Sequence, residues 1–220
     1  VPYAYCYRCA FGRQYPECSM SCLEYVDHLF KDPESGLAET GTMIVEPIQG
    51  ESGIVVPPDG FLQGLRKICD ENGVVMIVDE VQTGFGRTGK MWACEHSGIT
   101  PDIVTMAKAL GGIGIPNAGI MYRKDLDVWE PAAYVGTFRG NVVAHACGLA
   151  SIEYLEKNKV IEHANSLGRE VLSRLKEMEH ESNIIGEARG KGLMLAVEFV
   201  EDKKTKAPAL RFIFNSRKGK

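Results

Sequence analysis

The sequence predicts an α/β fold whose large domain is built on a largely parallel sheet. Four short apolar runs rich in β-branched residues and bounded by turn residues are typical of buried strands: 42–48, 74–79, 102–107 and 118–123. Between the first two runs, apolar residues recur at helical spacing up to Gly73, a residue that favours the end of a helix. Strand, helix and strand form the right-handed crossover unit of α/β domains. We therefore expect parallel strands that are covered on both faces.

The pattern changes to helices after residue 140. Asn141 is placed to cap a helix that reaches about Asn158. A second helix is expected over 160–178, because its apolar residues repeat on one face. Residues 192–200 then predict a strand.

The change of pattern predicts two domains. We expect residues 1–157 to form a large domain whose N-terminal part is missing, because the chain opens without a preceding element to pack on. Residues 158–220 are expected to begin a small α+β C-terminal domain that is incomplete. The basic tail 211–220 has no clear periodicity, which fits this expectation of truncation.

Composition limits the classes of partner. The chain has 220 residues, 45% hydrophobic and 25% charged, with a formal net charge of −4. This mildly acidic balance gives no reason to expect nucleic acid or an anionic membrane as a partner. No apolar run is long enough to span a membrane. Seven cysteines, an odd number, favour reduced thiols over a disulfide framework. We expect a cytoplasmic protein.

A glycine-rich loop after the second strand poses the first functional question. Residues 84–90 match G-x-x-x-x-G-K, the start of a phosphate-binding loop. However, Met91 stands where such a loop needs Ser or Thr for Mg²⁺, and the acidic strand comes directly before the loop. The sequence therefore argues against a nucleotide hydrolase. We expect the glycines to shape a surface loop.

An acid and a lysine follow neighbouring strands. Asp79 ends one predicted strand and Lys108 follows the next, at the sheet edge where open α/β sheets bind ligands. Adjacent strands lie about 5 Å apart, so the two side chains can address opposite sides of one small flat ligand. A ligand with a basic ring nitrogen and an aldehyde would suit both. Pyridoxal phosphate has these two groups. A turn acid and an exposed loop lysine remain the alternative.

Longer motifs identify a family. The segments "MIVEPIQGESG", "IVDEVQTGFGRTGKMWACEHSGITPDIVTMAKALGGIGIPNAG" and "GTFRGN" closely resemble class III pyridoxal-phosphate-dependent aminotransferases. The 4-aminobutyrate aminotransferase type matches best, and the resemblance covers about residues 1–207. It implies the fold type I of these enzymes and pyridoxal 5′-phosphate as cofactor.

The resemblance also assigns cofactor-binding residues. Asp79 would pair with the pyridinium nitrogen, and Lys108 would form the Schiff base with the cofactor. Val81 would lie beside the ring and Gln82 near its hydroxyl. Thr137 would reach the phosphate of the partner subunit's cofactor, which implies a homodimer.

Substrate contacts follow from the same resemblance. Glu46 and Glu51 correspond to the two acids of the family's E-P-x-Q-G-E motif, and the second pairs in the family with an Arg that is expected beyond residue 220. The implied reaction moves an amino group from an ω-amino acid, such as 4-aminobutyrate, to a 2-oxo acid. The alternatives are a pyridoxal-phosphate-dependent racemase or epimerase and an inactive truncated fragment.

Four cysteines near the start of the chain could instead suggest a zinc site. Their pattern is C-x2-C-x8-C-x3-C, formed by Cys6, Cys9, Cys18 and Cys22. The same run resembles a segment of the aminotransferases to which the resemblance assigns no metal role. We expect free thiols and no metal.

Overall fold

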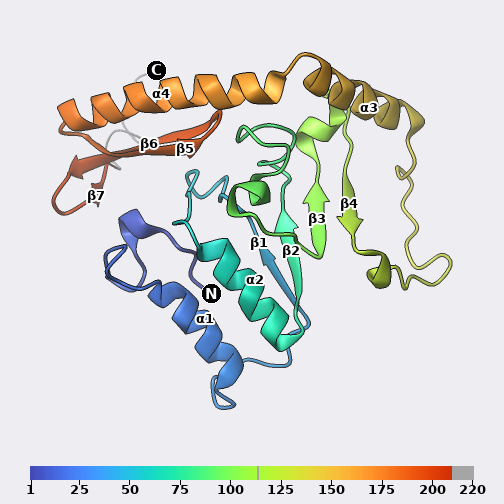
Figure 1. Ribbon diagram of the computed structural model, residues 1–220, viewed down its shortest axis with the longest axis horizontal. Coiled ribbons are helices and arrows are strands. Elements are labelled where there is room, and N and C mark those ends of the chain that lie inside the picture. The colour runs from blue at the N-terminus through green and yellow to red at the C-terminus, as the bar shows by residue number, and fades with distance from the viewer. Residues whose placement is uncertain (113, 210–220) are drawn as a thin grey trace, which may run out of the picture.

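A four-stranded sheet forms the centre of the fold in this computed structural model, which describes residues 1–112 and 114–209. Its strands are β1 (Thr42–Val45), β2 (Val75–Asp79), β3 (Ile103–Met106) and β4 (Gly119–Tyr122), in that spatial order (Figure 1). The first three run parallel, which confirms the expected α/β class. β4 runs antiparallel to β3, so the expectation of a fourth parallel strand is wrong. Among its described residues, the 107–118 connection forms a 3-10 helix and no longer element, and a parallel return needs a longer crossover.

In Figure 1 α2 (Phe61–Asn72) lies beside β1 and β2, and α1 (Ser21–Lys31) lies on the outer side of α2. α1 lies against α2, and α2 ends at Gly73, as predicted. Gly64 permits the close approach of the two helices, because a Cβ there would lie 2.2 Å from a methyl carbon of Leu23. Their buried residues and those of β2 form the main core, which contains Val26, Leu62, Leu65, Ile68, Cys69, Met76 and Val78.

The sheet is not covered on both faces by the described residues. Ile44 in β1 is 64% exposed, and every residue of β4 is exposed. A continuous apolar run predicts a strand but does not tell whether this chain itself covers each face.

A long helix and a second sheet follow the central one. α3 (Val142–Lys157) begins where Asn141 accepts hydrogen bonds from the backbone N–H groups of Val143 and Ala144, which confirms the predicted cap. α4 (Val160–Glu181) runs above the antiparallel strands β5 (Ile185–Lys191) and β6 (Met194–Asp202) (Figure 1). β7 (Ala207–Pro208) completes this sheet. The division into domains at residue 157 stays a prediction.

Short 3-10 helices connect the larger elements. They are η1 (Cys6–Arg8), η2 (Ala93–Ser97), η3 (Lys108–Gly111) and η4 (Lys124–Leu126). Among the described helices, none is long and apolar enough to cross a membrane. The basic tail 211–220 lies outside the described residues.

The glycine-rich loop 84–90 is largely buried, so the expectation of a surface loop is wrong. Its glycines permit close packing against α4: a Cβ on Gly86 would lie 2.8 Å from Ile161, and one on Gly89 2.7 Å from Asn165. Glu80, which is fully buried, accepts hydrogen bonds from the Thr83 hydroxyl and from the backbone N–H of Cys94. The segment after β2 is therefore packed against α4 and hydrogen-bonded to η2.

Candidate functional site

The carboxyl ends of β2 and β3 bring Asp79 and Lys108 to one edge of the sheet. Asp79 is the last residue of β2 and pairs in register with Thr105 of β3. Lys108 begins η3 two residues after β3 ends, and its φ of +41° is unusual for a residue with a side chain. Such strain is common at functional sites. The ends of β2 and β3 are neighbours, as the sequence predicted, and the placing of both side chains on one ligand stays a prediction.

Packing against α3 fixes the segment that carries Lys108. Gly148 of α3 lies so close that a Cβ there would be 2.7 Å from the carbonyl oxygen of Leu110. Asn117 also donates a hydrogen bond to the carbonyl of Ala144, at 3.2 Å. Both ends of the connection to β4 are thereby held on α3.

The amine of Lys108 is in direct contact with one predicted site residue. Its Nζ donates to Oε1 of Gln82, at 3.1 Å. Gly50 adjoins the same amide, because a Cβ on Gly50 would lie 2.1 Å from Oε1 of Gln82. Three segments of the chain, which follow β1, β2 and β3, therefore meet at the amide of Gln82.

The two predicted substrate acids lie on the segment after β1. Glu46 is half-buried, and its Oε2 accepts from the backbone N–H of Gly50, at 2.8 Å. Glu51 is exposed on the turn that follows. Glu46 thus shapes the turn, and Glu51 faces solvent.

A wide cavity of about 1520 Å³ opens beside Lys108. Val81, Lys108 and Thr137 all line it, and Asp79 lies outside its lining. Thr137 belongs to the exposed segment between β4 and α3. Thr105 also lines the cavity, and its buried hydroxyl has no hydrogen-bond partner among the described residues.

Sequence inspection missed four residues around this site: Gly50, Glu80, Thr105 and Arg189. Glu80 was visible as the acid after Asp79. Burial of the Cys94 thiol, followed by the charge of Glu80 beside it, raises the pKa of that thiol to about 12. For the other three, the relevant contacts join residues far apart in the chain. Spacing within one segment gave no signal for them.

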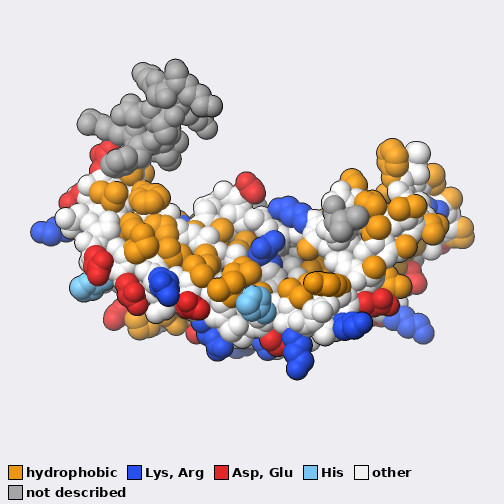
Figure 2. All heavy atoms as spheres, turned by 90° about the horizontal axis from the view of Figure 1, so that it is seen from above, with side chains coloured by type: hydrophobic (Ala, Val, Ile, Leu, Met, Phe, Trp, Pro, Cys, Tyr) orange, Lys and Arg blue, Asp and Glu red, His pale blue; other side chains and the backbone are white. Residues whose placement is uncertain are grey.

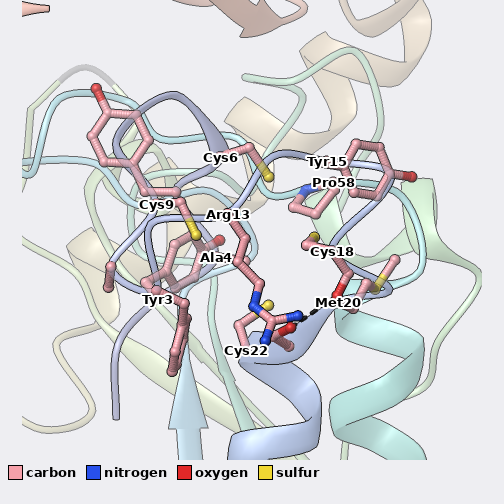
Figure 3. Close-up of a pocket in the computed structure, with 14 residues that line it drawn as sticks. Tyr3, Ala4, Cys6, Cys9, Arg13, Tyr15, Cys18, Met20, Cys22 and Pro58 are labelled. Carbon is pink, nitrogen blue, oxygen red and sulfur yellow. Dashed lines mark hydrogen bonds between the residues drawn. The ribbon is translucent and has the colours of Figure 1, made fainter. Parts of the chain in front are cut away.

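The four N-terminal cysteines line a second, small cavity of about 20 Å³. In Figure 3 their side chains surround a common space, and the Arg13 side chain runs between them. All four are free thiols, and the described residues contain no group of three or more potential ligands arranged to hold a metal ion. The expectation that they bind no metal stays a prediction.

Comparison with known proteins decides the family. A sequence profile of the class-III aminotransferases matches residues 3–217. The chain belongs to the class-III aminotransferases. The match extends beyond residue 207, so the expectation that the resemblance stops there is wrong.

Relatives of several activities resemble this chain. It is 43% identical over 200 residues to a diaminobutyrate–2-oxoglutarate aminotransferase of Rhizobium meliloti, covering 91% of this chain and 42% of the relative. It is 42% identical over 210 residues to a leucine/methionine racemase of Thermococcus litoralis, covering 95% and 47%. The chain thus spans less than half the length of these relatives.

Solved structures agree with the fold. A Bacillus anthracis aminotransferase superposes with a TM-score of 0.85 at 30% identity, covering all of this chain and 51% of that one. An (S)-enantioselective ω-transaminase of Thermomicrobium roseum gives a TM-score of 0.83 at 33% identity, covering 93% and 46%. The chain therefore has the fold of pyridoxal-phosphate-dependent aminotransferases.

The cofactor of class-III aminotransferases is pyridoxal phosphate, and the groups at the sheet edge fit it. Lys108 offers an exposed amine for an aldehyde, and Asp79 offers a carboxylate for a ring nitrogen from the neighbouring strand. The partnerless hydroxyl of Thr105 adds one unused polar group beside Asp79.

Proposed function

We propose that this chain carries the cofactor-binding and amine-handling part of an aminotransferase that moves an amino group from an ω-amino acid to a 2-oxo acid. The observation that carries the proposal is the contact of Lys108 with Gln82 at the carboxyl edge of the sheet. An exposed lysine amine that donates to an amide oxygen and lies beside a wide cavity suits covalent attachment of an aldehyde cofactor.

Each residue of the edge has a role in this proposal. Lys108 would attach the cofactor and, when displaced by substrate, carry the proton from the substrate's carbon. Asp79 would keep the ring nitrogen protonated, with Val81 against the ring and Gln82 near its hydroxyl. When bound, pyridoxal phosphate supplies an electron sink for the bond that breaks at that carbon.

The substrate is proposed to be an ω-amino acid of the 4-aminobutyrate type. The Rhizobium relative named for diaminobutyrate and 2-oxoglutarate supports an amine donor with a second polar end and a 2-oxo acid acceptor. Glu46 and Glu51 lie on the turn that adjoins Gln82. They are our candidates for the substrate-side acids.

A homodimer is the proposed assembly. The segment between β4 and α3 exposes large apolar side chains, which are Val128, Trp129, Tyr134, Val135 and Phe138, and Val142 at the start of α3 is exposed as well. In Figure 2, apolar side chains gather at the end of the molecule that carries this segment. Exposed apolar area of this kind favours a protein partner. Thr137 lies within the segment, so a second copy packed there would bring this residue to the neighbouring site.

A racemase is the second candidate, favoured by the identity to the Thermococcus protein. Product analysis separates the two. The chain is incubated with pyridoxal phosphate, 4-aminobutyrate and 2-oxoglutarate, and glutamate is measured; a parallel sample receives L-leucine alone and is tested for the D-enantiomer.

We expect glutamate from the native chain and none from Lys108→Arg, which keeps the charge but cannot attach an aldehyde in this way. D-leucine without glutamate would favour the racemase. If neither glutamate nor D-leucine forms, the result would favour the inactive fragment.

A further inference from the structure

Arg189 of β5 binds the turn that follows β1, although 135 residues separate it from Ile54. Its Nε donates to the carbonyl of Ile54 at 3.0 Å, and one terminal nitrogen donates to the carbonyl of Gly53 at 2.7 Å. One planar guanidinium thus holds two successive carbonyls. A lysine ammonium cannot reproduce this fork.

The turn that Arg189 holds is strained. Ile54 has a φ of +53°, a conformation that β-branched residues rarely adopt, and Gly53 has a φ of +108°. Inside the turn, the N–H groups of Gly53 and Ile54 both donate to the carbonyl of Gly50, at 3.1 and 3.0 Å. Backbone strain of this kind persists only where surrounding contacts fix it, and it is concentrated at functional sites.

The turn in turn adjoins the lysine site. Gly50 begins it, and the space for a Gly50 Cβ is filled by the amide of Gln82, which accepts from Lys108. A shift of Gly50 toward or away from the sheet would therefore move the amide or leave a gap beside it. Contacts run without interruption from β5 to the amine of Lys108.

Arg189 is itself firmly placed. Its other terminal nitrogen donates to Glu187 and Glu198, at 2.6 and 2.7 Å, and its guanidinium lies 5.0 Å from the ring centre of Tyr5. Glu198 also binds Arg8, at 2.5 Å. The side chain of Arg189 is only 11% exposed. Such a residue is a rigid anchor for the turn.

We propose that Arg189 is a positioning residue that clamps the 50–54 turn and thereby sets where Gln82 meets Lys108. The second sheet is thus coupled to the lysine site by one side chain. The functional part of this inference rests on the proposed function of Lys108, whereas the clamp itself is a property of the chain alone.

Hydrogen exchange of the turn tests the clamp. The variant is Arg189→Lys, which keeps the positive charge beside Glu187 and Glu198 but loses the fork. The matched control is Arg8→Gln, which breaks another bond to Glu198 and touches no carbonyl of the turn. Amide exchange is measured for the peptide that contains Gly53 and Ile54, in the full chain.

We expect exchange in this peptide to be about tenfold faster in Arg189→Lys than in the control, with similar melting temperatures. Exchange within about twofold of the control would overturn the clamp. If Arg189→Lys melts much lower, Gly53→Ala is the second variant. Its Cβ would lie 3.3 Å from the Arg189 guanidinium, in a backbone conformation that disfavours alanine, so the same peptide should exchange faster.

The link to the lysine site has a separate readout. Borohydride trapping of pyridoxal phosphate on Lys108 is measured against cofactor concentration, and Arg189→Lys should need about fivefold more cofactor for half-labelling than Arg8→Gln. Equal cofactor concentrations for half-labelling in the two variants would overturn the positioning role of Arg189. Absence of labelling in the native chain would refute the proposed function instead, and the exchange experiment would still decide the clamp.

Discussion

Replacing Gly50 with alanine should disturb the lysine site while leaving the fold almost intact. The new Cβ would lie 2.1 Å from Oε1 of Gln82, whereas such contacts rarely fall below 3.0 Å, so the oxygen must move by at least about 0.9 Å. The hydrogen bond from Lys108, now 3.1 Å long, would then be stretched or lost. The backbone of Gly50 lies outside the positive-φ region, so alanine itself is tolerated there.

The size of the effect follows from that one bond. An intramolecular hydrogen bond contributes about 1 kcal/mol, and this one is exposed, which places the loss at the lower end for a charged donor. About 1 kcal/mol corresponds to about a fivefold change in an equilibrium. The flexible end of Gln82 absorbs the overlap, so the free energy of unfolding should change by less than about 1 kcal/mol.

The assay is borohydride trapping of pyridoxal phosphate on Lys108, compared with urea unfolding of the same variants. Gly41→Ala is the matched control, since a Cβ there meets nothing within 4 Å. Gly50→Ala should need about fivefold more cofactor than the control for half-labelling of Lys108. In a Gln82→Ala background, adding Gly50→Ala should not raise the cofactor concentration for half-labelling any further. An equal effect in both backgrounds would show that Gly50 does not act through the amide of Gln82.

Three further predictions concern stability and thiol chemistry. Thr105→Val should raise the free energy of unfolding by about 1 kcal/mol in the absence of cofactor, because the buried hydroxyl has no partner; a lower value in urea unfolding would show that it has one. Burial would raise the pKa of Glu198, but Tyr5, Arg8 and Arg189 together hold it below its ordinary value of 4.5. The contribution of this carboxylate to the free energy of unfolding is therefore complete above about pH 4.5, and it is lost as the pH falls through the lower pKa of the folded state. Glu198→Gln should flatten this acid-side slope, and an unchanged slope in acid titrations would contradict it. Cys6 is exposed as a residue, but partial desolvation of its thiol, followed by the neighbouring thiols, raises the pKa of this thiol to about 11. Alkylation by iodoacetamide at about pH 8 should therefore be about a hundredfold slower than for a free cysteine, and a rate like that of the free amino acid would contradict this.

Local sequence patterns predicted most of the regular structure. Periodicity located β1 to β4, and the predicted stop at Gly73 and cap at Asn141 agree with α2 and α3. These signals lie within one element, so no knowledge of packing is needed. By contrast, β5 was missed, because its residues, with Glu187, Arg189 and Lys191 among them, look polar although they pair with β6.

The candidate site was predictable only in part. The order of strands places Asp79 and Lys108 at one edge, because parallel strands end on the same side. The contacts of Gly50 and Arg189 depend on tertiary packing over long separations, which spacing does not encode. The same holds for the buried glycine loop: its G-x-x-x-x-G-K pattern is typical of a surface loop, and only tertiary packing of α4 on its glycines buries it.

Mapping of the modified lysine tests directly whether Lys108 is the residue that attaches the cofactor. The purified chain is incubated with pyridoxal phosphate, reduced with borohydride and digested, and the modified lysine is identified by peptide mass, with Lys108→Arg as control. We predict one label per chain at Lys108, and none at that peptide in the control. Labelling scattered over several lysines, at equal levels in both proteins, would contradict it.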